Sequence, residues 1–326
     1  MELPWNSGMR QGNKMSRPPV TALLPVRNGE QWMPNAIHNL NRTLTPYDEV
    51  VIVNDYSTDK TLDIIEESKF IAPLRVITNP GRGLVPALNA GISAAKNEWI
   101  ARFDVDDDYL SNRFALQFEN VSDGTVAIFS DFEIYSEKMD YLGYFPSPLY
   151  HAAIYVSLLN SERNAHPSVV FRKESVLTVG GYYEEDFPCE DLSLWLRLAK
   201  IGRLSAVPQP VLKYTLRKNS VSSSRYLEAK HKTKLVLEKY FDYNKNMDLK
   251  EFELILIDYK KYPQELERKL FLARDLCDKT LMKNQELKLR FFIIKIAINL
   301  SLNPRTYLVL AKQVLMRKKR RKYRKT

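Results

Sequence analysis

The chain is poor in cysteine and glycine, and each shortage excludes a class of protein. Two cysteines among 326 residues cannot form a disulfide framework, so we expect a reducing compartment. There are 11 glycines, and no glycine-rich phosphate loop of the dinucleotide-binding or ATPase kind follows a predicted strand. No apolar stretch is long enough to span a bilayer, and the N-terminus lacks the apolar core of a signal peptide. We therefore expect a cytoplasmic protein.

The remaining composition is that of a folded protein with an uneven charge. Hydrophobic residues make up 44% of the chain and aromatic residues 11%, which is enough for a buried core. The net charge is +10, but eight basic residues and no acidic residue lie between 317 and 325, which leaves +2 elsewhere. Such a tail suits an anionic lipid surface, although it can also bind nucleic acid or only keep the protein soluble. We favour an anionic membrane surface over nucleic acid as its partner.

Short apolar runs alternate with amphipathic segments in the first third of the chain. The predicted strands cover 20–24, 49–53, 74–78 and 99–103, and the predicted helices between them cover 28–40, 60–68 and 85–95. Pro25 is expected to end the first strand. The alternation predicts an α/β fold with a mostly parallel sheet that is covered by helices on both faces.

Polar residues gather where these strands end. Asn28 follows the first strand, Asp55 the second and Asp104 the fourth, and sheets of this kind bind ligands outside the carboxyl ends of their strands. The segment 103–108 holds four carboxylates, which repel one another unless a positive group lies among them. Oxygen ligands suit a hard cation such as Mg²⁺ or Mn²⁺, completed by a diphosphate. The alternative is a solvated acidic turn.

The composition changes again toward the C-terminus. Further strands are predicted at 127–130, 168–171 and 207–216, and a helix at 190–201. Pro208 and Pro210 are expected to confine part of the last strand to a sheet edge. From Arg225 onward glycine is absent, and Lys, Glu and Leu recur at helical spacing. We therefore expect a disordered N-terminus over 1–18, an α/β domain over 19–224, and a helical extension with the basic tail over 225–326.

Several segments, in order and at matching distances, resemble the blocks of the family-two glycosyltransferases. They are 25–30 (PVRNGE), 51–61 (VIVNDYSTDKT), 89–92 (NAGI), 100–107 (IARFDVDD), 166–168 (HPS), 171–172 (FR), 181–182 (GY) and 190–198 (EDLSLWLRL), with Arg113 and Gln117 between them. The resemblance covers residues 20 to 224. It implies an inverting enzyme with the Rossmann-like GT-A fold, a nucleotide-sugar donor that is usually linked to uridine diphosphate, and Mn²⁺ or Mg²⁺.

The resemblance also implies which residues bind the donor. These are Pro25, Val26, Arg27, Asn28, Glu30, Asp55, Arg82, Asp104, Val105, Asp106 and Arg217. Asp55 would bind the nucleobase, although aspartate is also common in turns. Asp106 would bind the metal directly, and Asp104 would meet the ribose or a metal-bound water. Arg27 and Arg82 would reach the phosphates or lie on the surface as solvated charges, and Asp107 and Asp108 would be acids at a helix start.

On the acceptor side, Asp191 corresponds to the catalytic base. Glu190 would orient the acceptor, and both acids can also cap the helix that they begin. His166 corresponds to a histidine on the acceptor side, with a purely structural role as the alternative.

Three positions depart from the family pattern. The family usually has a second acid where Asn54 stands and a glycine where Tyr56 stands. The family pattern therefore does not predict the shape of the loop around Asp55. It often has a histidine where Arg217 stands. Because a guanidinium cannot ligate a metal, we expect Arg217 to clamp the diphosphate instead.

The sequence therefore predicts a bacterial-type, metal-dependent inverting glycosyltransferase. Its acceptor would be a glycan or a polyprenyl-linked saccharide in the assembly of capsule, O-antigen or exopolysaccharide. Segments 291–300 and 307–315, together with the tail, would pack on the catalytic domain or place the enzyme at the inner face of the plasma membrane. One rival is a nucleotidyltransferase, whose glycine-rich N-terminal loop is missing. The other is an inactive GT-A binding protein with a tail for membrane or nucleic acid.

Overall fold

The computed structural model describes residues 17–119, 121–149, 151–159, 165–217, 220 and 224–240. Residues 1–16 of the N-terminus, which is predicted to be disordered over 1–18, lie outside the described residues. The segments 291–300 and 307–315 and the basic tail also lie outside them.

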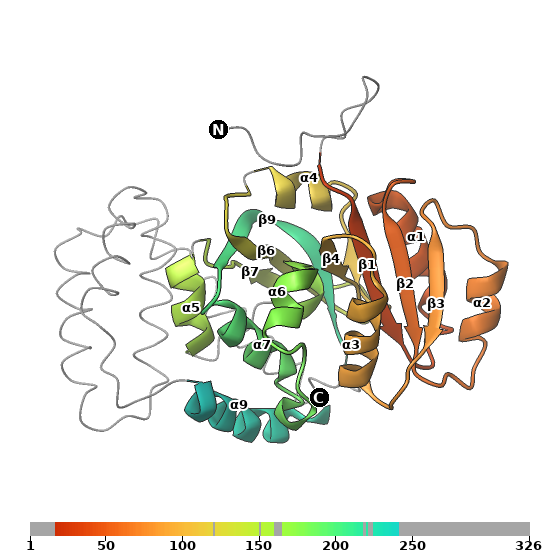
Figure 1. The fold of residues 1–326 in the computed structure, drawn as a ribbon. Coiled ribbons are helices and arrows are strands. Elements are labelled where there is room, and N and C mark those ends of the chain that lie inside the picture. The colour runs from red at the N-terminus through yellow and green to blue at the C-terminus, as the bar shows by residue number, and fades with distance from the viewer. Residues whose placement is uncertain are drawn as a thin grey trace, which may run out of the picture.

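The described chain folds around one mixed sheet (Figure 1). Its strands are β1 (Val20–Val26), β2 (Glu49–Asn54), β3 (Leu74–Thr78), β4 (Trp99–Arg102), β5 (Asp108–Tyr109), β6 (Thr125–Ser136), β7 (Tyr141–Phe145), β8 (Val170–Arg172) and β9 (Arg203–Leu216). They lie in the order β3-β2-β1-β4-β8-β6-β9-β5, and β7 pairs with β6. The half formed by β3, β2, β1 and β4 is parallel, whereas β8 runs antiparallel to both β4 and β6.

Helices cover both faces of this sheet, as the sequence predicts. They are α1 (Met33–Thr43), α2 (Thr61–Glu67), α3 (Leu84–Ala94), α4 (Arg113–Phe118), α5 (His151–Leu159), α6 (Lys173–Thr178), α7 (Glu190–Leu198) and α9 (Tyr226–Tyr240), with the short turns η2 (His166–Ser168) and η3 (Glu184–Asp186). Alternate residues of β1 face the two layers: Leu23 packs with α3 and α7, whereas Ala22 and Leu24 pack with α1 and α4. In Figure 1, α3, α6 and α7 lie across the viewer's side of the sheet.

Two boundaries near the first strand differ from the prediction. Pro25 does not end β1, which continues to Val26. The pairing with β4 stops at Leu23, so the N–H that proline lacks costs no ladder hydrogen bond on that side. The first helix begins at Met33 rather than at Asn28, because Asn28 has a φ of 53° and the chain turns before it enters the helix.

Two later strands also begin elsewhere than predicted. Ser168 lies in η2, so the strand expected from 168 begins at Val170. The last strand begins at Arg203 and lies between β6 and β5. β5 pairs with it only at 212–213, so the part that contains Pro208 and Pro210 has β6 alone as its neighbour, and the register with β6 shifts there.

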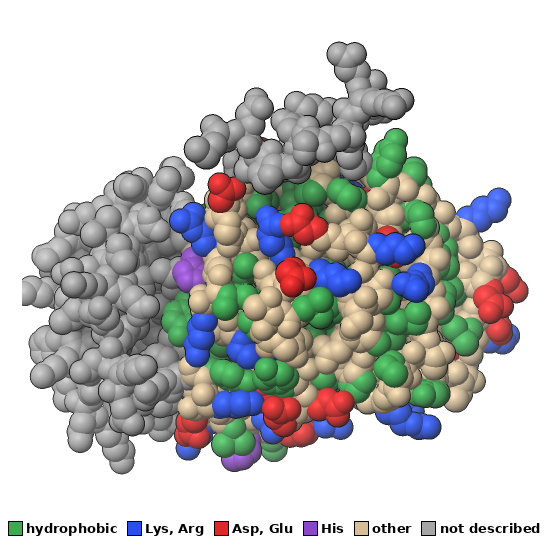
Figure 2. Space-filling view, in the orientation of Figure 1, with side chains coloured by type: hydrophobic (Ala, Val, Ile, Leu, Met, Phe, Trp, Pro, Cys, Tyr) green, Lys and Arg blue, Asp and Glu red, His purple; other side chains and the backbone are tan. Residues whose placement is uncertain are grey.

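The packed body continues past residue 224. Helix α9 lies against α7 along the lower edge of the molecule in Figure 1, and Ala229, Val236 and Leu237 are buried in the same core as α7. The Cys189 thiol, just before α7, lies 3.2 Å from the carbonyl oxygen of Ala229. Along the same edge, basic and acidic side chains lie next to one another (Figure 2). Among the described helices, none combines the length and the apolar character that a bilayer span requires.

Helix α3 approaches the sheet closely because it carries a glycine at the contact. A Cβ at Gly91 would lie 2.1 Å from Leu23 Cδ1 and 3.0 Å from Val53 Cγ2. We expect Gly91→Ala to lower the free energy of unfolding in urea by about 1–3 kcal/mol, because these two core side chains must shift. Ser93→Ala, on the exposed face of the same helix, should change it by less than about 0.5 kcal/mol. Equal unfolding midpoints for the two variants would contradict this packing.

Candidate active site

The acidic segment after β4 is balanced by one arginine close to it in the chain and by two from distant segments. The Asp104 carboxylate lies 2.5 Å from the guanidinium of Arg102, and Asp106 forms an ion pair with Arg217 at the end of β9. Asp108 pairs with Arg42 of α1 at 2.6 Å. The segment is therefore not a solvated acidic turn. The prediction that Asp107 and Asp108 begin a helix is wrong, because Asp108 opens β5 and α4 begins only at Arg113.

Asp107 is buried, and it accepts a hydrogen bond of 2.9 Å from the Thr215 N–H of β9. Burial raises the pKa of Asp107 well above its usual range, and the charges of Asp106 and Asp104 add to this effect. Burial also raises the pKa of Asp106, and the Asp104 carboxylate adds to this, while Arg217 opposes both effects. The crowded carboxylates therefore favour any cation that can reach them.

The residues present fit a divalent cation only in combination with a ligand. Among the described residues, no three His, Cys, Asp or Glu side chains converge on one point. Asp106 and Asp104 can supply one or two carboxylate oxygens at the carboxyl end of β4. Magnesium-type sites often use one or two carboxylates together with substrate phosphates and water, so this set is sufficient when a diphosphate is bound.

Asp55, at the carboxyl end of β2, fastens the loop that precedes α3. Its carboxylate accepts a hydrogen bond of 2.7 Å from the Asn79 side-chain amide and bonds of 3.0 Å from the N–H of Gly83. A carboxylate offers about four acceptor positions, so it can accept a further donor beside these contacts. The structure thus assigns Asp55 the turn-stabilising role, and its carboxylate keeps the capacity to accept a hydrogen bond from a nucleobase N–H.

The loop after Asp55 keeps the shape that a glycine would allow. Tyr56 has a φ of 58°, a left-handed conformation that a non-glycine residue adopts at some cost. The Arg82 guanidinium lies 5.0 Å from the centre of the Tyr56 ring. Tyrosine at this position therefore preserves the backbone path and adds a platform for Arg82.

Hydrogen bonds connect the segment 25–30 to the loop before α2. The Asn28 side-chain oxygen accepts from the Thr58 N–H at 2.8 Å, and the Glu30 carboxylate accepts from the Lys60 N–H at 2.8 Å. Arg27 is exposed. Gly29 lets the neighbouring loops approach, since a Cβ there would lie 2.6 Å from Val26 and 3.3 Å from Val105. The loop after β1 is therefore in contact with both the loop after β2 and the loop after β4.

The acceptor-side residues gather at the N-terminus of α7. Glu190 is buried and Asp191 is half-buried, both in the first turn of the helix. The His166 ring packs on Trp195, and its Nε2 lies 2.7 Å from the Tyr182 hydroxyl. Burial, helped by the Arg102 charge, holds the pKa of His166 well below its usual range, so this ring is neutral near pH 7.

Tyr182 connects this region to the acidic segment. Burial raises its pKa well above the usual value; the Arg102 charge opposes the rise, and the Glu190 and Asp191 charges add to it. Arg102 itself pairs with Asp104. Tyr182 therefore lies within electrostatic range both of Asp191 and of Arg102, the partner of Asp104. The sequence assigned no role to Arg102, although it stands only two residues before Asp104, because no local pattern shows that its side chain turns toward that acid. It assigned none to Trp32 either, whose ring lies under the guanidinium of the distant Arg217.

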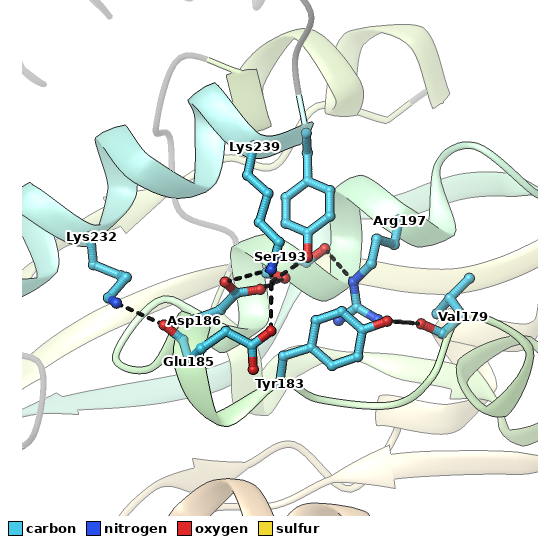
Figure 3. A network of polar contacts seen from close by, with 9 residues as sticks. Val179, Tyr183, Glu185, Asp186, Ser193, Arg197, Lys232 and Lys239 are labelled. Atoms are coloured by element: carbon cyan, nitrogen blue, oxygen red, sulfur yellow. Dashed lines mark hydrogen bonds and ion pairs between the residues drawn. The ribbon is translucent and has the colours of Figure 1, made fainter.

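A polar network braces the loop that leads into α7 (Figure 3). The buried carboxylate of Asp186 accepts from the Ser193 hydroxyl, from the Tyr240 hydroxyl at 3.1 Å and from the Lys239 ammonium at 3.3 Å. The Arg197 guanidinium lies 3.9 Å over the Tyr183 ring. Because two of the donors to Asp186 come from α9, this helix helps to fix the start of α7 and therefore Asp191.

The arrangement of the sheet and its helices is that of the GT-A glycosyltransferases. The crystal structure of S. aureus TarS 1-349 in complex with UDP-GlcNAc aligns with a TM-score of 0.54 at 20% identity, over 67% of this chain and 65% of that one. A mannosyltransferase from Pyrobaculum calidifontis, solved with GDP-Man and Mn²⁺, aligns with a TM-score of 0.52 at 18% identity, over 98% of this chain and 91% of that one.

Sequence comparison identifies the family within this class. Residues 21–178 match the model of glycosyl transferase family 2, so this region belongs to that family and the protein is a glycosyltransferase. The amylovoran biosynthesis glycosyltransferase AmsE of Erwinia amylovora is 27% identical over 217 residues, which are 63% of this chain and 79% of AmsE. A UDP-Gal:alpha-D-GlcNAc-diphosphoundecaprenol beta-1,3-galactosyltransferase of Escherichia coli is 26% identical over 185 residues, 55% of this chain and 66% of that protein.

The Asp186 network yields a stability prediction. We expect Asp186→Ala to lower the free energy of unfolding by about 1–3 kcal/mol, because the Ser193 and Tyr240 hydroxyls lose a buried acceptor. Glu185→Ala is the matched control, since its side chain is 66% exposed and makes only a surface ion pair with Lys239. That variant should lose less than about 1 kcal/mol. Urea denaturation measures both, and an equal loss in the two variants would contradict a bracing role for Asp186.

Proposed function

We propose that the protein is a metal-dependent inverting glycosyltransferase whose donor is a UDP-sugar and whose acceptor is a glycan or a lipid-linked saccharide. The observations that support the proposal are the contacts of the loop after β1 with those after β2 and β4, and the position of Tyr182 within electrostatic range of Arg102, Glu190 and Asp191. Ligands of such sheets bind outside the carboxyl ends of the strands, which is where we propose that the donor and the base meet.

The donor would lie across the carboxyl ends of β1, β2 and β4. Asp55, held by Asn79 and Gly83, accepts the nucleobase N–H, which suits uracil. Arg82, on its Tyr56 platform, is free to turn toward the phosphates, as is the exposed Arg27. Asn28, Glu30, Val26 and Val105 shape the loops, and Pro25 directs the first of them.

Asp106, with Asp104 beside it, would hold the divalent cation together with the diphosphate oxygens. When bound, Mn²⁺ or Mg²⁺ neutralises the charge that develops on the departing nucleoside diphosphate. The chain supplies the remaining positive charge through Arg217, whose forked guanidinium matches a phosphate in geometry.

Asp191 acts as the base in this proposal. Its carboxylate takes the proton of the acceptor hydroxyl while that oxygen attacks the anomeric carbon, and the nucleoside diphosphate leaves from the opposite face, which inverts the configuration. Asp191 lies in the first turn of α7, where the helix N-terminus carries a partial positive charge that favours an acidic side chain. A positioned carboxylate of this kind contributes about 10²- to 10⁴-fold to the rate. Glu190 orients the acceptor, and His166 supports the wall of the site through Tyr182 and Trp195.

The acceptor class rests on the relatives. One is named for amylovoran biosynthesis and another for a diphosphoundecaprenol-linked acceptor. A saccharide on a polyprenyl carrier, or a growing polysaccharide, is therefore the acceptor that we propose. The eight basic residues between 317 and 325 would bring the enzyme to the inner face of the plasma membrane, where such carriers are used.

A donor screen tests the function directly. We expect slow hydrolysis of one or two members of a panel of UDP-, GDP- and dTDP-sugars in the presence of Mn²⁺, with activity lost on chelation by EDTA and restored by added Mn²⁺. UDP with Mn²⁺ should also raise the melting temperature, because a ligand that binds only the folded state stabilises it. A chain that is protected by an oligonucleotide and not by any nucleotide, and hydrolyses no donor, would contradict the proposal.

The role of Asp191 has its own test. Asp191→Asn should reduce transfer by at least about 10²-fold while leaving the affinity for UDP unchanged, because an amide cannot accept the proton. Asp123→Asn, in the exposed turn before β6, is the matched control and should transfer at the normal rate. If Asp191→Asn loses nucleotide binding together with transfer, Asp191 is not the base.

A further inference from the structure

Arg217 occupies a position that conflicts with a metal on Asp106. Its guanidinium pairs with the Asp106 carboxylate, and the two side chains are only 23% and 14% exposed. The flat face of the same guanidinium lies 4.3 Å over the ring of Trp32, just before α1. The arginine is therefore enclosed between the metal motif and an aromatic platform, rather than extended into solvent.

Each of the two carboxylates that a metal would need has an arginine as its counter-charge. Asp104 has Arg102 as its counter-charge, and Asp106 has Arg217. A divalent cation that reached Asp106 would lie in contact with the guanidinium, and two positive groups at such a distance repel each other strongly outside bulk water. Arginine cannot relieve the conflict by losing its proton, because it stays charged at every physiological pH. The guanidinium must therefore move away from Asp106 before a cation can bind there.

A diphosphate offers the guanidinium an equivalent partner close by. Arginine binds phosphate oxygens through two parallel hydrogen bonds, as it does a carboxylate. Trp32 can support the guanidinium face in either position, since a cation above an indole ring is stabilised without fixing the direction of its N–H groups. The donor therefore brings both the replacement partner for Arg217 and the additional ligands that complete the coordination of the metal.

We propose that Arg217 is a positioning residue that holds Asp106 closed to metal until the donor diphosphate draws the guanidinium away. Metal and nucleotide then bind as a unit, and each increases the affinity for the other by the same factor. This inference rests on the proposed function, because it assumes that a nucleoside diphosphate binds beside Asp106. It adds that the departure from the family's usual histidine changes the order of binding, since a histidine would help to hold the metal where the arginine excludes it.

Mn²⁺ binding, measured as the loss of the free-ion EPR signal with and without UDP, tests the inference without any turnover. The wild type should bind Mn²⁺ weakly alone and at least about tenfold more tightly with UDP. Arg217→Ala should tighten Mn²⁺ binding in the absence of UDP by about tenfold, because the cation no longer competes with an enclosed ion pair. The same variant should bind UDP with Mn²⁺ more weakly, since the clamp on the diphosphate is lost.

Three further variants make the result specific. Arg217→Lys keeps the positive charge and should leave Mn²⁺ binding without UDP at the wild-type level. Arg203→Ala, an exposed arginine at the start of the same strand, should behave as the wild type in every measurement. Asp106→Asn in the Arg217→Ala background should abolish the gain, which assigns the new affinity to Asp106. Circular dichroism and the melting temperature establish that each variant is folded.

The two failures are distinguishable. If the wild type binds neither UDP nor another nucleoside diphosphate, the proposed function is wrong. If UDP binds but Arg217→Ala leaves Mn²⁺ binding without UDP unchanged or weaker, the proposed function stands and the role of Arg217 is wrong. UDP binding that is equally tight with and without Mn²⁺ in the wild type would also overturn the inference, because the arginine would then replace the metal instead of yielding to it.

Discussion

The structure is organised around the mutual repulsion of carboxylates at the end of β4. Asp104, Asp106, Asp107 and Asp108 follow one another within a turn and a short strand, and like charges at such separations are costly away from bulk water. Guanidinium groups from β4, from the end of β9 and from α1 form ion pairs with three of these acids. The fourth, Asp107, is buried, and burial raises its pKa. The arginine partners connect the middle of the sheet with β9 and with α1, so ion pairs help to hold the site together.

The junction between the two halves of the sheet gives these charges a rigid support. Arg113 is fully buried and donates hydrogen bonds of 3.1 Å to the carbonyl oxygens of Arg102 and Val169. Its guanidinium lies 4.7 Å from the centre of the Phe103 ring and 4.9 Å from that of Tyr109, and burial lowers its pKa to about 10. One residue thus ties the end of β4, which carries the acids, to the segment before β8, which carries His166.

The two departures from the family pattern at Tyr56 and Arg217 have different consequences. The first concerns the backbone conformation, and the second concerns the charge beside Asp106. Tyr56 adopts a left-handed backbone conformation that glycine reaches readily, and its ring supports Arg82. Arg217 cannot imitate a histidine, because it carries a permanent charge and donates hydrogen bonds without accepting any. Its pairing with Asp106 is the consequence of that difference. A substitution in backbone shape is thus tolerated, whereas a substitution in charge alters what the site can bind.

The sequence alone determined the alternation of strands and helices, the parallel half of the sheet, and the position of the acidic segment and of Asp55 at strand ends. These follow from local periodicity and from the rule that the carboxyl ends of parallel strands share one edge. Tertiary structure alone decided the partners. Arg217 meets Asp106 and α9 braces the start of α7 because the sheet order brings remote segments together. It also decided that β1 continues through Pro25, since only the place where the neighbouring strand stops makes a missing N–H harmless. Periodicity is a property of neighbours in the chain, whereas charge pairing and strand ends depend on neighbours in space.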